Sequence, residues 1–485
     1  IFRIGSPSAL KKSETAFLSG TIKDVETGEP YAGAIVYVER LKAGVVTNNA
    51  GYYSLELPRG QFVVEYRMVG MKTAKRNVIM YSDGMLDVGL VQSTNLLGEV
   101  TVSASRENNV REIEMGIEKI NMKMLKQIPM GMGEADLMKT SLLLPGVSSA
   151  GEASAGFNIR GGNVDQNLIL SDGAPIINPS HFFGFFSAFN PDIIQDVVLY
   201  KSGIPAKYGG RISSVMDIKL KEGSTEKVNI SGGVSLFTGK LMVEVPLQKK
   251  KSSIVLSGRT TYSDWVLGLL EDVQLQKSSA GFNDIQGLLT FSAGEKDDFS
   301  ISGYLSNDRF DYYKETAMSY SNLTSSVKWN HKYNTRFFSQ FSGIISDYNY
   351  SVDSKQVPET SSSMNYSLSQ RKLRTDFTWL PNEKHKIEFG LDATHYSLAP
   401  GTQIPLGPAS ETTPKTLQKE QAVEPAVYIS DEYEVSPRLM LSGGFRFTLF
   451  TSLGPETRFI YTPGVPRSVS SITDTAYYRK GQILK

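Results

Sequence analysis

The side chains that most often perform chemistry are few in this chain and widely spaced. The chain has no cysteine, and its four histidines are at least ten positions apart. The nearest pair, His385 and His395, falls on one strand pattern, where ten residues separate the rings too far for one metal ion. The other two histidines are His181 and His331. The sequence therefore predicts no metal site and no bound cofactor.

Short motifs that mark an active site are also missing from the sequence. There is no GxSxG turn, no HExxH motif, and no phosphate-binding or dinucleotide-binding loop between a strand and a helix. The glycine pairs Gly161-Gly162 and Gly209-Gly210 are not followed by a helix that could present its N-terminus to a phosphate. We therefore expect a protein that is not an enzyme.

The composition excludes several other classes. The 51 basic and 50 acidic residues leave a net charge of +1, which argues against a nucleic-acid-binding protein. The lack of cysteine excludes a disulfide scaffold. No apolar run approaches the roughly 20 residues that a membrane-spanning helix needs, and the longest patches resemble Val266–Leu270. A barrel strand exposes only every second side chain to lipid, so the lack of a long apolar run does not exclude a transmembrane barrel.

The elements that position these residues begin with a small all-β domain over residues 16–92, after a tail of a preceding segment at residues 1–15. Phe62, Val64 and Tyr66 alternate with Glu65 and Arg67, as in a half-buried strand. Turn residues recur between several short strands of this kind, which is typical of a β-sandwich.

Residues 106–222 mix helix and strand. Glu134–Leu144 has apolar residues at helical spacing and is stopped by Pro145-Gly146. Short apolar runs such as Val197–Leu199 and Val215–Leu220 read as strands. A small α+β domain is predicted for this segment.

From residue 223 to residue 485 the rhythm changes to long alternating strands. Leu439, Leu441, Phe445 and Phe447, for example, are separated by small or polar residues. Short turns alternate with longer polar stretches, and about eleven strands of about ten residues fit the segment. The longer loops are expected at Ser263–Ala280, Asp308–Ser321, Ser351–Ser363 and Ala399–Glu424. This pattern is typical of a transmembrane antiparallel β-barrel.

Four motifs carry a resemblance to a known family. FNIRGG (157–162), DGAP (172–175), DVVLYKSGIPAKYGG (196–210) and RISSVMDI (211–218) resemble the plug domain of TonB-dependent outer-membrane transporters. The resemblance implies a plug inside a barrel of 22 strands in the bacterial outer membrane. About half of those strands are present here, and the chain begins at Ile1 without a signal peptide, so we expect both ends of the chain to be incomplete.

The N-terminal domain resembles a second family. SGTIKD (19–24), TGEP (27–30), Gly33-Ala34 and NAGYY (49–53) are similar to the carboxypeptidase-regulatory-like domain. That domain has no catalytic role, and it commonly precedes the plug in transporters of Bacteroidota. The resemblance implies that it lies in the periplasm.

The linker at residues 93–105 occupies the place of a TonB box. Its β-prone run consists of Glu99, Val100, Thr101, Val102 and Ser103. A lone strand of this kind can add to the sheet edge of another protein, here a TonB-type inner-membrane energy-coupling protein. A plain linker strand is the alternative.

Two arginines match plug arginines of the family. The resemblance implies that Arg160 and Arg211 pair with barrel carboxylates and act as a latch. A buried arginine–carboxylate pair suits that role, because loss of one partner leaves an uncompensated charge. The partners are expected in strands beyond the chain, while Glu244, Glu388 and Asp392 are candidates on periodicity alone, with solvated lumen charges as the alternative.

The apical loops of the plug supply candidates for contact with a ligand. Their positions point to Asp165, Gln166, Asn178, His181, Phe182 and Phe183. The run PSHFFGFF at residues 179–186 is unusually aromatic for a loop. It either grips a substrate or packs beneath the extracellular loops, and packing is the favoured interpretation.

The resemblance implies import of a scarce nutrient by energy-coupled displacement of the plug. Outer-membrane lipids are expected partners, a surface lipoprotein or other subunits of an outer-membrane complex remain open, and no nucleic acid is expected. The alternatives are a structural subunit of an insertion or secretion machine and an adhesin without a channel. Siderophores, cobalamin, glycans and peptides all use this architecture, so the substrate stays undetermined.

Overall fold

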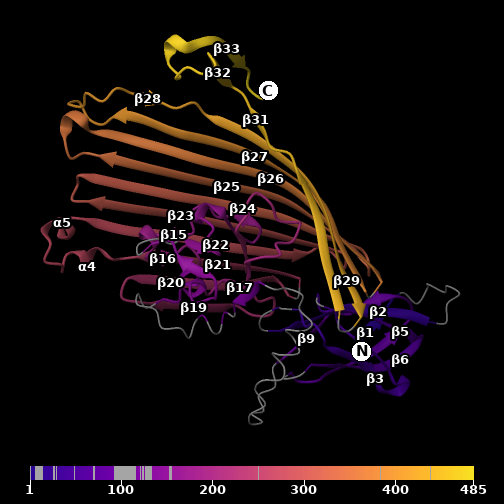
Figure 1. Ribbon diagram of the computed structural model, residues 1–485. Helices are drawn as coiled ribbons and strands as arrows, with labels where there is room; N and C mark the ends of the chain where they lie inside the picture. Colours follow the sequence, from indigo (N-terminus) through magenta and orange to yellow (C-terminus); the bar gives the residue numbers. More distant parts are fainter. Residues whose placement is uncertain are drawn as a thin grey trace.

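The computed structural model contains three bodies that follow one another along the chain (Figure 1). An N-terminal β-domain is followed by a mixed domain, and a broad curved sheet arches over the mixed domain. The backbone of Phe183 is described without its side chain. The described residues are 2–5, 15–25, 28, 30–48, 50–68, 71–91, 116–120, 122, 125, 134–151, 156–249, 251–382, 384–436 and 439–484.

The N-terminal domain is a sandwich of two sheets. One sheet has the strand order β1-β7-β6-β3-β4, and the other has the order β5-β2-β8 with β9 also paired to β2. The predicted sandwich is confirmed. The elements are β1 (Phe2–Ile4), β2 (Thr15–Asp24), β3 (Ile35–Val38), η1 (Glu39–Leu41), β4 (Ala43–Val46), β5 (Tyr52–Pro58), β6 (Gly60–Arg67), β7 (Ala74–Met80), β8 (Gly84–Met85) and β9 (Val88–Leu90).

The core of the sandwich follows from the alternation in its strands. Phe62, Val64 and Tyr66 of β6 are buried between the two sheets. Opposite them, the hydroxyl of Tyr53 lies 3.0 Å from that of Tyr66 and donates to the carbonyl oxygen of Leu86 at 2.7 Å. Both buried hydroxyls therefore have partners, as buried polar groups require.

The mixed domain packs short elements around one small sheet. The sheet has the order β10-β17-β18-β13-β14, in which β13 and β18 run parallel. Its elements are β10 (Ile117–Ile120), α3 (Leu137–Ser141), β11 (Val147–Ser149), β12 (Phe157–Ile159), η2 (Val164–Gln166), β13 (Asn167–Ser171), β14 (Ala174–Pro175), β15 (Ser180–His181), η3 (Phe182–Gly184), β16 (Phe186–Ser187), β17 (Ile194–Tyr200) and β18 (Ser214–Leu220).

Apolar side chains from the central strands and from α3 form the core of this domain. Val197, Leu199, Met216 and Ile218 are buried together with Leu137. The helix is shorter than the sequence pattern indicated, because Asp136 caps it by accepting from the amide of Lys139 and the chain turns soon after Ser141. The predicted α+β domain is confirmed.

The curved sheet is a meander in which each strand pairs antiparallel with the next. Its main path contains eleven strands, from β19 to β30, while β28 pairs with β27 and β31 pairs with β29. The elements are β19 (Asn229–Val234), β20 (Thr238–Gln248), β21 (Ser252–Thr261), α4 (Asp264–Leu267), α5 (Val273–Gln276), β22 (Ser279–Ser292), β23 (Asp297–Tyr312), β24 (Thr316–Asn334), β25 (Phe337–Ser354), η4 (Pro358–Thr360), β26 (Ser362–Asn382), β27 (His385–Pro405), β28 (Lys415–Thr416), β29 (Glu420–Ser436), β30 (Leu439–Thr448) and β31 (Thr451–Leu453). A separate hairpin follows, formed by β32 (Glu456–Tyr461), η5 (Val469–Ser471) and β33 (Ile472–Tyr478).

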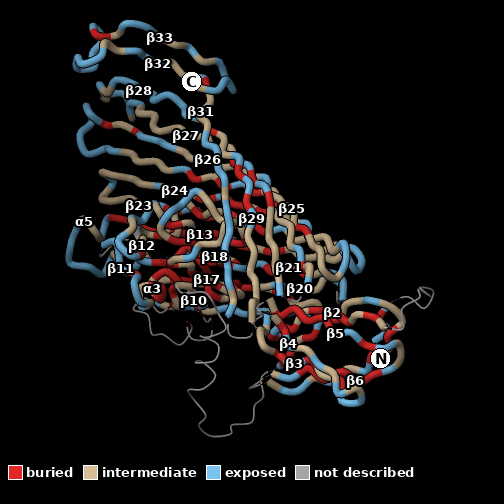
Figure 2. Tube along the Cα trace, turned by 45° about the vertical axis from the view of Figure 1, so that its right-hand side comes forward, coloured by how far each residue is buried: buried red, intermediate tan, exposed pale blue. Residues whose placement is uncertain are grey.

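The two faces of this sheet differ as the alternation predicted. The outer face carries exposed apolar side chains such as Leu241, Ile285 and Leu373, the last of which is 72% exposed. The inner face carries buried polar side chains such as Ser306 and Asn322. Figure 2 shows one group of buried residues where this inner face meets the mixed domain and another inside the N-terminal domain. The mixed domain is therefore a plug seated against a partial barrel wall.

The strands are longer than the ten residues expected, and three of the four predicted loops are shorter, those at 308–321, 351–363 and 399–424. β26 and β27 each span 21 residues. The predicted loop at 308–321 reduces to a turn between β23 and β24, since both strands continue through it with paired backbones. Hydrogen bonding along the neighbouring strand thus extends the wall where polar composition alone suggested a loop. Among the described residues, no helix is long and apolar enough to cross a membrane.

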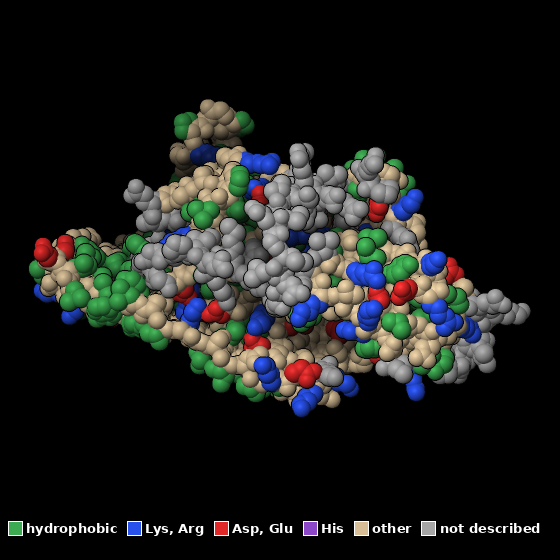
Figure 3. Space-filling model, turned by 90° about the horizontal axis from the view of Figure 1, so that it is seen from below, with side chains coloured by type: hydrophobic (Ala, Val, Ile, Leu, Met, Phe, Trp, Pro, Cys, Tyr) green, Lys and Arg blue, Asp and Glu red, His purple; other side chains and the backbone are tan. Residues whose placement is uncertain are grey.

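The N-terminal domain contacts the turns at one end of the wall. The hydroxyl of Tyr52 donates to the carbonyl oxygen of Thr335 at 2.7 Å. The guanidinium of Arg336 lies 5.4 Å from the ring centre of Phe17. Seen from below, the domain occupies one side of this end and displays mixed charges (Figure 3).

These two contacts give a first prediction. The double substitution Tyr52→Phe and Arg336→Ala removes one hydrogen bond and one cation–π contact, which together stabilise the docked domain by about 1–2 kcal/mol. Because the chain has no cysteine, spin labels on Glu39→Cys and Asn382→Cys report the distance between domain and wall without background. We expect a broader distance distribution in the double variant. An unchanged distribution, or the same broadening in a Tyr37→Phe control, would show that these contacts do not hold the domain.

Candidate functional site between plug and barrel wall

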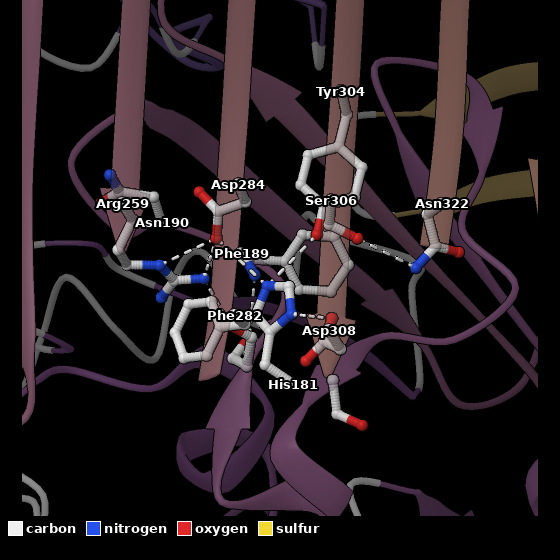
Figure 4. Close-up of polar contacts among 12 residues, drawn as sticks. His181, Phe189, Asn190, Arg259, Phe282, Asp284, Tyr304, Ser306, Asp308 and Asn322 are labelled. Atoms are coloured by element: carbon white, nitrogen blue, oxygen red, sulfur yellow. Dashed lines mark hydrogen bonds and ion pairs between the residues drawn. The ribbon is translucent and has the colours of Figure 1, made fainter. Parts of the chain in front are cut away.

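A fully buried histidine joins the plug to the wall. His181, at the end of β15, has no exposed surface. Its Nδ1 lies 2.8 Å from Oδ2 of Asp308 on β23, and its Nε2 lies 3.1 Å from Oδ2 of Asp284 on β22. Figure 4 shows the ring between these two carboxylates, with Tyr304 beside it. The hydroxyl of Tyr304 lies 3.3 Å from the same Nε2.

The geometry favours a charged imidazole. An ionised carboxylate only accepts hydrogen bonds, so both ring nitrogens must donate to satisfy Asp284 and Asp308. Burial alone would lower the pKa of His181, but the hydrogen bonds and charges of the two carboxylates outweigh burial and raise that pKa above its ordinary value. The plug therefore places a cation between two wall anions.

A buried arginine of the wall completes the arrangement. Arg259 of β21 donates from Nε and Nη2 to Oδ2 of Asp284, at 2.9 and 2.6 Å. Its Nη1 donates to Oε1 of Glu134 in the plug at 3.3 Å, and its Nη2 also donates to the carbonyl oxygen of Ser187 at 2.7 Å. Each side of the interface thus supplies both a cation and an anion: His181 and Glu134 from the plug, and Arg259 with Asp284 and Asp308 from the wall. We call His181, Glu134, Arg259, Asp284 and Asp308 the anchor.

Local backbone geometry fixes the plug side of the anchor. Phe182 has a φ of +47°, a left-handed conformation that is uncommon for an aromatic residue. Its amide donates to Oδ1 of Asp308 at 3.1 Å, so one carboxylate holds both this amide and the ring of His181. Nearby, Asp136 accepts from the amide of Ser187 at 3.0 Å. Burial raises the pKa of Asp136, and the amide hydrogen bonds from Lys139 and Ser187 oppose that shift.

Further along the wall, the contacts between plug and wall are single hydrogen bonds or ion pairs. Lys328 of β24 reaches Asp172 at 2.7 Å, and Ser326 donates to the carbonyl oxygen of Asp172 at 2.9 Å. Ser346 of β25 donates to the carbonyl oxygen of Pro175 at 2.7 Å. The anchor is therefore the densest charged contact among the described plug residues.

The three candidate carboxylates of the wall all have cationic partners. Glu244 pairs with Lys221 at the end of the plug, at 2.5 Å. Glu388 lies 3.8 Å from Lys207 of the plug. Asp392 pairs with Arg446 of β30, within the wall, at 2.9 Å. Two of the three meet the plug, through lysines where arginines were expected.

The two plug arginines lie outside these pairs. Among the described residues, no carboxylate forms an ion pair with Arg160 or Arg211. The backbone of Arg160 is left-handed, with a φ of +50°, and its side chain is exposed. Arg211 donates from Nη1 to the carbonyl oxygen of Gly210 at 2.7 Å. A latch role for these two arginines stays a prediction.

Arg211 borders a large cavity at the plug surface. This cavity, of about 980 Å³, lies between the plug and strands β26, β27 and β29. Its lining includes Tyr396, whose hydroxyl donates to Oε2 of Glu424 at 2.7 Å. The cavity is thus polar and charged near the plug, with Leu398 and Phe450 farther along its wall.

The other predicted site residues lie on short elements and loops of the plug. Asp165 is exposed, and Gln166 accepts from the amide of Asn163 through Oε1 at 3.1 Å. Asn178 accepts from the hydroxyl of Ser180 at 3.0 Å. The side chain of Phe183 and the run Glu99–Ser103 lie outside the described residues. Whether any of these positions meets a ligand stays a prediction, and in this conformation His181 serves the anchor instead.

Four anchor residues escaped the sequence reading. Arg259, Asp284 and Asp308 occupy positions that alternate toward the inner face, and such residues look like solvated lumen charges in a sequence. Glu134 was read only as part of a helix. Two features of the sequence could have indicated these residues. The alternation places them on the inner face, and a charged side chain such as Arg259 is rare at a position that a plug covers. Among the described residues, no group of three or more His, Asp or Glu side chains is placed to hold a metal ion.

Family models match two segments of the chain. Residues 18–102 match the CarboxypepD_reg-like domain, and residues 110–215 match the TonB-dependent receptor plug domain. No curated protein matches the chain at a significant level.

Solved structures with the same fold include a receptor and two transporters. A mutant of the ferric enterobactin receptor PfeA from Pseudomonas aeruginosa is 15% identical with a TM-score of 0.53, over 73% of this chain and 60% of that one. The ferric citrate transporter FecA is 16% identical with a TM-score of 0.55, over 72% of this chain and 58% of that one. The copper transporter OprC is 11% identical with a TM-score of 0.56, over 75% of this chain and 59% of that one.

The chain thus spans about three fifths of the length of these structures. At such low identity the similarity concerns the fold, while the plug model identifies the domain inside it. These three structures are receptors and transporters, which are not enzymes. The chain therefore carries a carboxypeptidase-regulatory-like domain and a TonB-dependent receptor plug domain, and it has the plug-and-barrel fold of the TonB-dependent receptors.

Proposed function

We propose that this protein is an outer-membrane receptor that imports a scarce nutrient by energy-coupled displacement of its plug. The observation that carries the proposal is a folded plug domain held against the polar inner face of a wall whose outer face is apolar. A wall of this kind has a use for a removable plug only if something passes through the barrel.

The outer face supports a place in a lipid bilayer. Phe291, Phe299, Trp329 and Phe341 follow one another across neighbouring strands, with ring centres 4.9 to 6.1 Å apart. They lie beside short turns, below the band of exposed leucine, isoleucine and valine. Aromatic girdles mark the membrane interface of transmembrane barrels. On this reasoning the short turns and the N-terminal domain face the periplasm.

Ligand entry is proposed from the opposite end, through the cavity of about 980 Å³ beside Arg211. In this mechanism the plug stays closed by default, because moving it away from the wall separates His181 from Asp284 and Asp308. Separation of buried charges costs several kcal/mol for each uncompensated ion. An external pull is therefore required, and a bound ligand alone does not open the path.

The pull is proposed to act on Glu99–Ser103, at the end of the first matched segment and ahead of the matched plug domain. A strand with free backbone groups can extend a sheet of a TonB-type inner-membrane protein. Outer-membrane lipids are the other proposed partner. A surface lipoprotein, or other subunits of an outer-membrane complex, would be additional partners, and co-purification from detergent-solubilised membranes reports all of them together.

The coupling segment gives the test of this proposal. The double substitution Val100→Pro and Val102→Pro removes two backbone donors and prevents regular strand pairing. We expect growth on the transported nutrient to be lost, with normal amounts of protein in the outer membrane. The growth panel would supply ferric siderophores, cobalamin, glycans or peptides as single scarce nutrients.

Val100→Ile and Val102→Ile form the matched control, since both keep the strand propensity and the donors. Import should continue in that variant. Undiminished growth of the proline variant on every nutrient that the protein supports would contradict energy-coupled import. Loss of a stable membrane complex without any defect in import would instead favour a structural subunit of an outer-membrane assembly.

A further inference from the structure

A small apolar cavity adjoins the anchor on the side of the plug apex. It has a volume of about 110 Å³ and lies between the plug and the segment that joins β21 to β22. This segment contains the short helices α4 and α5. The lining residues are Phe182, Phe186, Phe237, Thr261, Ser263, Val266, Leu267, Gly281 and Phe282.

The two hydroxyl groups of the cavity already donate their hydrogens to backbone carbonyl oxygens, so neither has a hydrogen left to donate to a ligand. The hydroxyl of Thr261 accepts from the amide of Phe282 at 2.8 Å and donates to its carbonyl oxygen at 3.3 Å. The hydroxyl of Ser263 donates to the carbonyl oxygen of Ala280 at 2.6 Å. A buried water needs two to four polar partners, so this space favours apolar contents over water. A comparable apolar cavity of roughly 150 Å³ in another protein stays dry and binds benzene.

One ring connects the cavity to the anchor. Phe282 lines the cavity and stacks on His181 with ring centres 4.1 Å apart and planes 3° apart. The guanidinium of Arg259 lies 5.1 Å from the centre of the same ring. A group bound in the cavity would therefore contact Phe282, whose ring contacts both cations of the anchor, His181 and Arg259. Figure 4 shows these three side chains.

The backbone of one residue that lines the cavity has a strained conformation, as is common at ligand-binding sites. Phe182, which lines the cavity, is held in the left-handed region by the hydrogen bond from its amide to Asp308. Non-glycine residues in that region cost about 1–3 kcal/mol in general and cluster at ligand clamps and switch regions. Here the strain turns an aromatic residue into the cavity directly after the anchor histidine.

We propose that this cavity binds an apolar group, an aryl or short branched alkyl, of the molecule that the barrel imports. The proposal rests on the import function above and adds the chemical class of one part of the ligand. Entry of such a group moves the ring of Phe282 against His181 and Arg259. Ligand binding therefore perturbs the anchor, which holds the plug to the wall.

The test uses benzene as the probe and the four histidines as reporters. Protein labelled with carbon-13 only in its histidine rings gives signals from His181, His331, His385 and His395. In detergent micelles, a benzene titration is expected to shift the His181 signal in a saturable way and to leave the other three unchanged. Because the other three lie away from the cavity, they report non-specific effects of benzene on the micelle.

Two variants of the same segment make the titration specific. Val266→Phe fills the cavity and should abolish the benzene-dependent shift, while the signal of His181 without benzene confirms that the anchor still forms. Leu269→Phe adds a ring at a position that is 73% exposed and should leave the shift intact. A shift of all four histidines together, or a His181 shift that persists in Val266→Phe, would overturn the apolar site.

The link to the imported ligand is tested by growth. Val266→Phe should raise the nutrient concentration needed for half-maximal growth about tenfold or more, the equivalent of 1.4 kcal/mol of binding, and Leu269→Phe should not. Unchanged growth of Val266→Phe would overturn the proposal, even with benzene bound. Failure of the import proposal is distinguished by a separate result. In that case the double substitution Val100→Pro and Val102→Pro would leave growth unchanged.

Discussion

Replacement of Arg259 by alanine is expected to loosen the plug from the wall more than any other single substitution at this interface. Arg259 compensates Asp284 of the wall and Glu134 of the plug, and all three side chains are buried. Without the guanidinium, two carboxylates remain in an enclosed space with His181 as the nearby cation. Breaking a buried charge network by removal of one partner destabilises by about 3–5 kcal/mol.

Hydrogen exchange of the plug measures this effect. In the lipid-embedded protein, backbone amides of residues 180–190 should exchange faster by about two to three orders of magnitude in Arg259→Ala, if their opening is governed by the anchor. Arg309→Ala is the matched control, because Arg309 is an exposed wall arginine with a long 3.7 Å pair to Asp311. Equal exchange in wild type and Arg259→Ala would show that the anchor does not hold the plug.

Raising the pH is expected to weaken the same contact, through His181. The folded-state pKa of His181 is raised above its unfolded value, so its contribution to stability is fully present below the unfolded pKa. That contribution is lost as the pH rises through the folded pKa. The groups that face His181 are Asp284, Asp308 and Tyr304, with Arg259 behind Asp284. At high pH two carboxylates then face a neutral ring.

A pH series of plug exchange tests this prediction. Above the ordinary histidine pKa of about 6.5, the wild-type plug should open more readily as the pH rises, once exchange is corrected for its intrinsic rate. His181→Asn should show weaker protection at the lower end and a flatter profile. His331→Asn should keep the wild-type profile, because His331 pairs with Asp297 on the wall and does not contact the plug. A wild-type profile without pH dependence would contradict the charged state of His181.

Much of the architecture was predictable because barrel strands and plug motifs leave local signals. The phase of Leu241, Leu439 and Leu441 gave the apolar outer face, and the turns gave the order of the strands. Strand length was not predictable in this way. Polar residues such as Asn307 and Ser319 belong to long strands that extend past the apolar band, and their pairing shows only when the neighbouring strand is present.

The site was less predictable, since its parts are far apart in sequence. His181 and Asp284 are separated by 103 positions, and no local pattern links them. The sequence drew attention to arginines of the plug and carboxylates of the wall. At the anchor the plug supplies a histidine and a glutamate, and the wall supplies the arginine. Glycine-rich loops around Arg160 and Arg211 signal a plug, but the charge partners depend on which strands stand opposite.

A disulfide between plug and wall would show whether the plug must leave its seat. Ala206 of the plug lies close to Gly444 of β30, and a Cβ built at Gly444 would be 3.0 Å from that of Ala206. A small adjustment reaches the spacing that a disulfide needs. Ser430→Cys with Gly444→Cys is the matched control, because it uses the same wall position and joins two wall strands (2.8 Å).

The chain has no other cysteine, so each pair forms a single defined bond. Growth on the nutrient found with the panel, measured before and after reduction, gives the answer. If the plug is displaced during import, Ala206→Cys with Gly444→Cys abolishes import while oxidised and regains it on reduction, and the control pair imports in both states. Import that continues undiminished through the oxidised plug–wall pair would contradict plug displacement.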